Sequence, residues 1–195
     1  MVTPLLTAWV FAGFVVLLAL QRLVELLLSR RNEARILAAG GRERAPEQMP
    51  VMRAIHTSWF LAMLAEVFLL ERPFVPVIAL AAALLFVAGQ ILRYAAIRSL
   101  GWRWTVRIMT LPGEPPIQQG VYRYIRHPNY LGVTLEIAAV PLMHMAYLTA
   151  ILYSVFNALF LFWRIQAEEN ALREQHRYDR HLEERPRFFP KLERE

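Results

Sequence analysis

One segment of eleven residues concentrates side chains that are suited to binding a charged ligand. It covers residues 122–132, reads YRYIRHPNYLG, and carries Arg126, His127, Pro128 and Tyr130. Proline is favoured in the first turn of a helix, so Pro128 predicts a helix start there. The free backbone N–H groups of a helix start can bind an anionic group. Arginines and tyrosines also anchor chains at membrane surfaces, and the residue types alone favour neither interpretation.

A second segment, RIQAEEN at residues 164–170, places opposite charges on one helix face. Arg164 and Glu168 are four residues apart and are therefore neighbours on a helix. As a surface ion pair they would contribute only about 0.3–0.5 kcal/mol. In a pocket, the carboxylate could hold a ligand ammonium and the guanidinium an anionic oxygen. The sequence does not separate Glu168 from Glu169, although the spacing to Arg164 favours Glu168.

Polar residues also interrupt the apolar stretches, and charges at membrane depth usually face the protein interior. These residues are Glu25, Glu66, Gln90, Arg93 and Glu136. They allow two interpretations, a transport path or pairs that stabilise a bundle, such as Arg22 with an acid. We favour the stabilising pairs.

Several well-known catalytic and nucleotide-binding motifs are absent from the sequence. It contains no GxxxxGK[ST], GxGxxG, HExxH or GxSxG motif. With no cysteine, it excludes a disulfide scaffold, a thiolate metal site and a cysteine nucleophile. The histidines lack the spacing of a zinc site, so we expect no metal.

The elements that must position these residues are membrane helices. The chain has 195 residues, of which 56% are hydrophobic and 19% charged. Apolar stretches at residues 5–28, 51–70 and 74–92 each approach the roughly 20 residues that span a bilayer. The fourth, residues 130–163, would be about 51 Å long as one helix, which exceeds the hydrocarbon core. A turn near Met143–Thr149, after Pro141, would divide it into a short helical hairpin. The sequence thus predicts an all-α polytopic membrane protein with about five transmembrane helices.

The basic residues predict the orientation, because positive charge concentrates on the cytoplasmic side of membrane proteins. Of the 22 lysines and arginines, 20 fall on one side of the predicted helices, with the C-terminus. The N-terminus is then outside and the C-terminus cytoplasmic. The lipid bilayer explains this charge better than nucleic acid does, so no nucleic-acid partner is expected.

The remaining segments are assigned as connections. Residues 29–50 are expected to form a short surface helix and a turn. Prolines and glycines in residues 99–129 argue against a long helix there. Residues 164–181 are expected to continue the last span as a cytoplasmic C-terminal helix, and residues 188–190 to fold back onto the membrane or the protein. We divide the chain into N-terminal helices, residues 1–98, and a catalytic half, residues 99–195.

The strings GVYRYI and RHPNYLG, followed by RIQAEENAL, resemble the isoprenylcysteine carboxyl methyltransferase family of integral-membrane enzymes. Tyr178 and RFFPKL are similar to that family's ending, so the resemblance covers roughly residues 85–192. The stretch RWTVRIMTLPGEPPIQQGVYRY is most similar to a bacterial branch found beside type III polyketide synthases, whose assigned role is alkylpyrone O-methylation. The resemblance therefore implies a bacterial inner (plasma) membrane location.

The resemblance also implies a cofactor, S-adenosyl-L-methionine, bound at the cytoplasmic face. The family's cofactor-binding residues correspond to Gly120, Tyr122, Arg126, His127, Pro128, Tyr130, Leu131, Glu168 and Glu169. The family's catalytic, substrate-orienting pair corresponds to Arg164 and Glu168.

The expected function is methyl transfer to a carboxylate or acidic enol oxygen of a lipophilic substrate, such as a prenyl- or acyl-chain molecule. Such an oxygen is already ionised near neutral pH, so the protein needs mainly to align the reactants. Three alternatives stay open. They are an NADPH-dependent membrane reductase of the sterol-reductase type, a phospholipid N-methyltransferase, and a non-enzymatic membrane partner or transporter.

Overall fold

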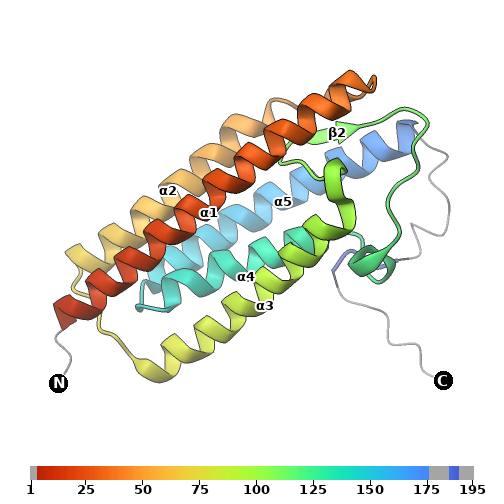
Figure 1. Cartoon of the computed structure of the whole chain (residues 1–195). Helices are drawn as coiled ribbons and strands as arrows, with labels where there is room; N and C mark the ends of the chain where they lie inside the picture. The colour runs from red at the N-terminus through yellow and green to blue at the C-terminus, as the bar shows by residue number, and fades with distance from the viewer. Residues whose placement is uncertain (1–3, 176–184, 189–195) are drawn as a thin grey trace, which may run out of the picture.

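A computed structural model of the chain, which describes residues 4–175 and 185–188, is a bundle of five helices (Figure 1). The helices are α1 Pro4–Ala38, α2 Gln48–Leu69, α3 Pro76–Leu100, α4 Pro128–Leu142 and α5 Tyr147–Gln175. Two 3₁₀ turns, η1 Gly101–Arg103 and η2 Gly120–Arg123, lie between α3 and α4. The all-α prediction is confirmed, with one small exception.

The exception is a two-stranded sheet that the sequence analysis did not predict. Strand β1 Arg42–Arg44 pairs antiparallel with β2 Ile108–Thr110, with Arg42 opposite Thr110. A Cβ on Gly41 would lie 2.9 Å from the Thr110 carbonyl oxygen, so glycine permits this close approach. The sheet joins the segment after α1 to the segment before α4.

The prediction of a separate surface helix after residue 28 is wrong. Helix α1 continues without a break to Ala38, because residues 29–38 contain neither glycine nor proline. It ends before Gly40, whose φ of +84° is the left-handed conformation that terminates many helices.

The predicted helical hairpin is confirmed at residues 128–175. Helix α4 begins at Pro128 and ends at Leu142, and the Ala146 N–H donates to the Pro141 carbonyl at 2.9 Å in the turn that follows. With 15 residues, α4 is only about 22 Å long. The other four helices are long and apolar enough to cross a membrane. Helix α5 runs unbroken past Arg164 to Gln175, and the rest of the predicted C-terminal helix lies outside the described residues.

The outer faces of the long helices are apolar, as a bilayer requires. Leu17, Val77 and Phe162 are examples, each more than 60% exposed in the isolated chain. The buried core is made by α1, α2, α4 and α5, and α3 packs closely on α4. A Cβ on Gly132 would lie 2.7 Å from the Gly89 carbonyl oxygen, so the two backbones touch there.

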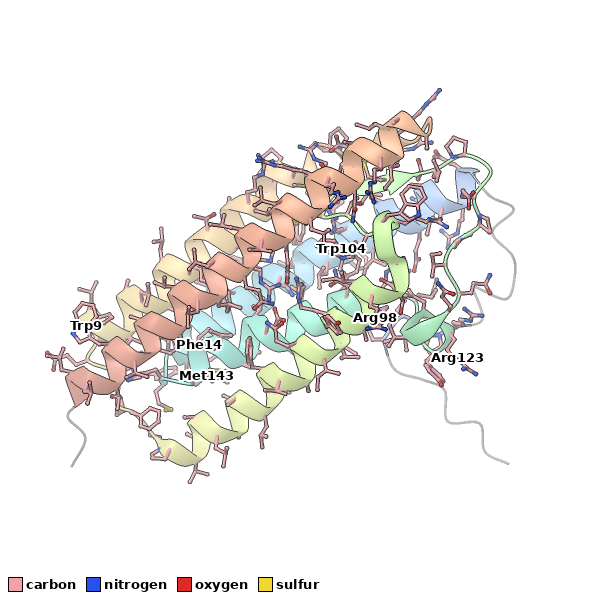
Figure 2. All side chains as sticks on the ribbon, viewed as in Figure 1. Trp9, Phe14, Arg98, Trp104, Arg123 and Met143 are labelled. Carbon is pink, nitrogen blue, oxygen red and sulfur yellow. The ribbon has the colours of Figure 1, made fainter. Side chains whose placement is uncertain are left out.

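The bundle has two distinct ends. We call the end that carries residues 29–47, 98–127 and 185–188 the basic end; the opposite end carries residues 70–75 and 143–146. In Figure 2, Arg98 and Arg123 lie at the basic end, and Trp9 and Met143 lie at the opposite end.

At the opposite end, Glu66 of α2 caps the start of α5. Its carboxylate accepts hydrogen bonds from the Leu148 N–H at 3.1 Å and from the Thr149 N–H and hydroxyl at 2.7 Å each. It also forms a salt bridge with Arg72 at 2.9 Å. The carboxylate thus satisfies the free N–H groups of a buried helix start.

We expect Glu66→Gln to destabilise the bundle by about 2 kcal/mol, because an amide NH2 group replaces a charged acceptor. Thermal unfolding in detergent measures this effect. Glu71→Gln is the matched control, since Glu71 is exposed. Equal unfolding temperatures for the two variants would contradict the capping role.

Candidate functional site

A cavity of about 560 Å³ begins at the basic end and extends between the helices. Six of the residues proposed from the sequence line it: Tyr122, Arg126, His127, Tyr130, Arg164 and Glu168. Four do not: Gly120, Pro128, Leu131 and Glu169. The α4 start and α5 therefore bring together segments that are about 40 residues apart.

Tyr130 joins the two charged residues of the Arg164–Glu168 pair. Its hydroxyl donates to the Glu168 carboxylate and accepts a hydrogen bond from Arg164 Nε at 3.0 Å. Arg164 also donates through Nη2 to the Val106 carbonyl. Arg164 is 5% exposed, and Nη1 takes part in neither hydrogen bond. The direct ion pair expected from the spacing is replaced by a bridge through a phenol, and the guanidinium faces the cavity in a fixed position.

Glu169 has a different environment from Glu168. It is 1% exposed and accepts hydrogen bonds from His127 Nε2 at 3.1 Å and from Arg187 Nη2 at 2.8 Å. Arg126 Nη1 lies 2.9 Å away. Since a carboxylate only accepts, His127 Nε2 carries a proton. Glu169 therefore orients His127 and Arg126 without lining the cavity itself, whereas Glu168 lines the cavity.

The segment 185–188 folds back onto the residues that precede α4. The backbone N–H groups of Arg126 and His127 donate to the carbonyls of Pro186 and Arg187 at 3.1 Å each. Arg185 Nη1 donates to the Tyr122 carbonyl at 3.0 Å. The expectation that Phe188 folds back onto the protein agrees with its ring lying 6.5 Å from that of His127, whereas residues 189–190 lie outside the described residues.

The residues that do not line the cavity have local roles. Pro128 begins α4, and the Leu131 N–H donates to the His127 carbonyl in its first turn at 3.1 Å. Gly120 begins η2 at φ +59°, where a Cβ would lie 2.1 Å from Ser99 Oγ. These three residues shape the backbone around the site.

Tyr122 and Asn129 complete the polar wall. Burial raises the pKa of Tyr122 well above its ordinary value, and the nearby Glu168 carboxylate raises it further. Its phenol is therefore a hydrogen-bond donor at neutral pH. Within the described part of the chain, Asn129 Oδ1 and Arg126 Nε are buried without a hydrogen-bond partner.

Sequence reasoning missed three contributors to the site: Val106, Trp104 and Arg187. Val106 acts through its backbone carbonyl, and Trp104 lines the cavity at 3% exposure. No local pattern marks such residues. Arg187 is the first residue of the RFFPKL string, whose family resemblance was the available signal.

A cluster of four charged residues lies deeper in the cavity wall. Arg22 pairs with Glu25 at 2.6 Å and with Glu136 at 2.7 Å, and Arg93 pairs with both carboxylates. The favoured interpretation of these residues as bundle-stabilising pairs agrees with this geometry. No group of three or more metal-binding side chains occurs in residues 4–175 and 185–188.

The apolar helices, with a polar cavity at one end, are those of an integral membrane protein. Residues 79–174 match the model of the isoprenylcysteine carboxyl methyltransferase (ICMT) family. The chain belongs to this family of methyltransferases.

Two curated proteins and one solved structure are similar to this chain. An uncharacterized protein of Bacillus subtilis (strain 168), YpbQ, is 38% identical over 161 residues, which cover 82% of this chain and 95% of that protein. An uncharacterized protein of Haemophilus influenzae (strain ATCC 51907 / DSM 11121 / KW20 / Rd) is 29% identical over 77% of this chain and 88% of its own. The solved structure of a eukaryotic intramembrane Ras methyltransferase, ICMT, is 21% identical, with a TM-score of 0.49. That match covers 64% of this chain and 46% of the solved one.

Proposed function

We propose that the protein transfers a methyl group from S-adenosyl-L-methionine to an oxygen of a lipophilic substrate. One observation carries this proposal. The Glu168–Tyr130–Arg164 network lines a single cavity that joins the polar basic end to the space between apolar helices. A water-soluble cofactor and a lipid-soluble substrate can thereby meet in one cavity.

The residues at the basic end suit the polar groups of this cofactor. The Glu168 carboxylate is placed to accept from an ammonium, and the Arg126 guanidinium to pair with a carboxylate. Arg126 Nε and Asn129 Oδ1 are buried and find no partner among the described residues, which fits a site completed by a polar ligand. His127, Tyr122 and Tyr130 form the wall around it. Four further residues support this wall without lining the cavity. They are Gly120, Pro128, Leu131 and Glu169.

Arg164 is the residue that we assign to the acceptor oxygen. When bound, S-adenosyl-L-methionine would supply a methyl group attached to a positively charged sulfur. A nucleophilic oxygen would attack the methyl carbon in line with the carbon–sulfur bond. Arg164 and Glu168 would act as the catalytic, orienting pair, with Tyr130 holding them apart. The guanidinium would bind the ionised carboxylate or enolate and aim it at the methyl group, which is a proximity effect.

The topology belongs to the same proposal. We place the basic end in the cytoplasm and the N-terminus outside, in a bacterial inner membrane, with the short α4 crossing as the fifth span beside α5. An enol substrate, such as an alkylpyrone, fits this proposal because of the resemblance noted for residues 103–124.

Calorimetric titration of the purified protein tests the cofactor assignment. We expect S-adenosyl-L-methionine to bind and NADPH not to bind. Arg126→Ala should weaken binding at least tenfold, because it removes a charge-assisted contact. Arg123→Ala is the matched control, because Arg123 is exposed at the basic end and does not line the cavity (Figure 2). Binding of NADPH alone would favour the reductase alternative and overturn the proposal.

Turnover against a small panel tests the acceptor. The panel contains a prenylcysteine, a fatty acid, an alkylpyrone and a phosphatidylethanolamine. We expect methylation of an acidic oxygen. If only the phosphatidylethanolamine is methylated, the protein is an N-methyltransferase and the proposed O-methylation is overturned.

A further inference from the structure

The cavity continues past Arg164 to a second group of polar residues, which we call the deep polar site. It consists of Arg22 and Glu25 of α1, His56 of α2, Arg93 of α3 and Glu136 of α4, all of which line the same cavity. The substrate's hydrophobic body would have to lie beside these residues. A purely hydrocarbon tail would leave their free hydrogen-bonding groups without partners.

Helix geometry gives the depth of this site. Glu136 follows Tyr130 by six residues on α4, which is about 9 Å at 1.5 Å per residue. On α2, the Gln48 side-chain amide donates to the Trp163 carbonyl at 3.5 Å, next to Arg164. His56 lies eight residues further on, about 12 Å deeper. The estimates from the two helices therefore place the deep polar site about 9–12 Å from the Tyr130–Arg164 pair.

The hydrogen-bonding state of His56 follows from one contact. Its Nδ1 lies 2.8 Å from the Met52 carbonyl, which can only accept, so Nδ1 carries a proton. In the neutral imidazole, Nε2 is then an acceptor with a free lone pair. Arg22, Arg93 and Arg164 line the same cavity, so a charged imidazole would add a further positive charge beside them.

The four charged residues supply a hydrogen-bond donor that complements the His56 acceptor. Both carboxylates are already paired with Arg22 and Arg93, so an anion is not needed to neutralise the cluster. The Arg22 side chain keeps 20% of its surface exposed, whereas Arg93 keeps 8%. Arg22 is therefore the guanidinium that remains open to a ligand.

From this arrangement we propose that the deep polar site binds an uncharged hydroxyl group in the hydrophobic body of the substrate. The hydroxyl donates to His56 Nε2 and accepts from the Arg22 guanidinium. The substrate is thus a lipophilic acid or enol with a second oxygen about 9–12 Å from the oxygen that is methylated. This inference rests on the proposed function only in placing the acceptor oxygen at Arg164.

Three fatty acids serve as probes of this site. They are octadecanoic acid, 9-hydroxyoctadecanoic acid and its positional isomer 2-hydroxyoctadecanoic acid, each titrated into the protein in lipid nanodiscs. Binding changes the tryptophan fluorescence, since Trp59 and Trp104 line the cavity. We expect the wild-type protein to bind the 9-hydroxy acid about tenfold or more tightly than the other two, because the partly buried His56 acceptor gains its partner.

Variants of His56 assign the preference to this residue. His56→Leu should remove the preference for the 9-hydroxy acid and leave the affinity for octadecanoic acid unchanged. His56→Gln keeps an acceptor and should keep part of the preference. Unchanged octadecanoic acid binding by His56→Leu also shows that the variant is folded.

The outcomes separate the two proposals. Equal affinity of the wild-type protein for all three acids overturns the deep polar site, as does a preference that survives in His56→Leu. Neither measurement requires the cofactor. A protein that prefers the 9-hydroxy acid but does not bind S-adenosyl-L-methionine would keep the deep polar site and lose the proposed function.

Discussion

Replacing Arg164 by alanine is expected to lower the rate of methyl transfer by about 10²–10³-fold, the usual effect of removing one group that stabilises an oxyanion. The guanidinium is held by Tyr130 and the Val106 carbonyl, so its position is fixed before a substrate arrives. Alanine removes the donor and leaves Glu168 and Arg126, the residues proposed to bind the cofactor, in place.

The measurement compares turnover with cofactor affinity. S-adenosyl-L-methionine should bind Arg164→Ala within a few-fold of its wild-type affinity, while turnover is lost. Arg98→Ala is the matched control, because Arg98 is exposed at the same end of the bundle (Figure 2). Full turnover in Arg164→Ala would exclude the assigned role, and loss of cofactor binding would move Arg164 into the cofactor site.

The second large effect is expected at Glu169, although this residue does not line the cavity. Glu169→Gln removes a carboxylate that contacts His127, Arg126 and Arg187 together. Removing one partner of a buried charge pair typically costs about 3–5 kcal/mol. We expect a lower unfolding temperature together with at least tenfold weaker binding of S-adenosyl-L-methionine.

Two further variants distinguish positioning from general destabilisation. Glu174→Gln is the matched control on α5, because the Glu174 side chain is 64% exposed. Arg187→Ala should weaken cofactor binding less than Glu169→Gln does, since the Arg187 side chain is 42% exposed and the Glu169 side chain 2%. A Glu169→Gln variant that binds the cofactor normally would contradict the positioning role.

Local chemistry explains which elements could be predicted from the sequence. Pro128 marked the start of α4 because its ring suits a first helical turn. The excess length of residues 130–163 over a bilayer indicated the hairpin, which turns at residues 143–146. The division at residues 98 and 99 stays a prediction, and the cavity takes residues from both sides of it.

The features that the sequence did not reveal depend on pairing between distant segments. Strand β1 is three residues long and exists only because β2 lies beside it. The spacing of Arg164 and Glu168 indicated a direct pair, but Tyr130 from another helix came between them. Glu168 and Glu169 are adjacent and chemically identical, so only the helix orientation assigns one to the cavity and the other to His127.

The attachment of residues 185–188 to the start of α4 has a consequence for biosynthesis. All five helices are translated before these residues, so the helices can enter the membrane while Arg126 and His127 still lack their last backbone partners. Insertion and completion of the site are therefore successive events. A released chain that ends after residue 175 should be membrane-integrated, and yet it would lack an assembled site.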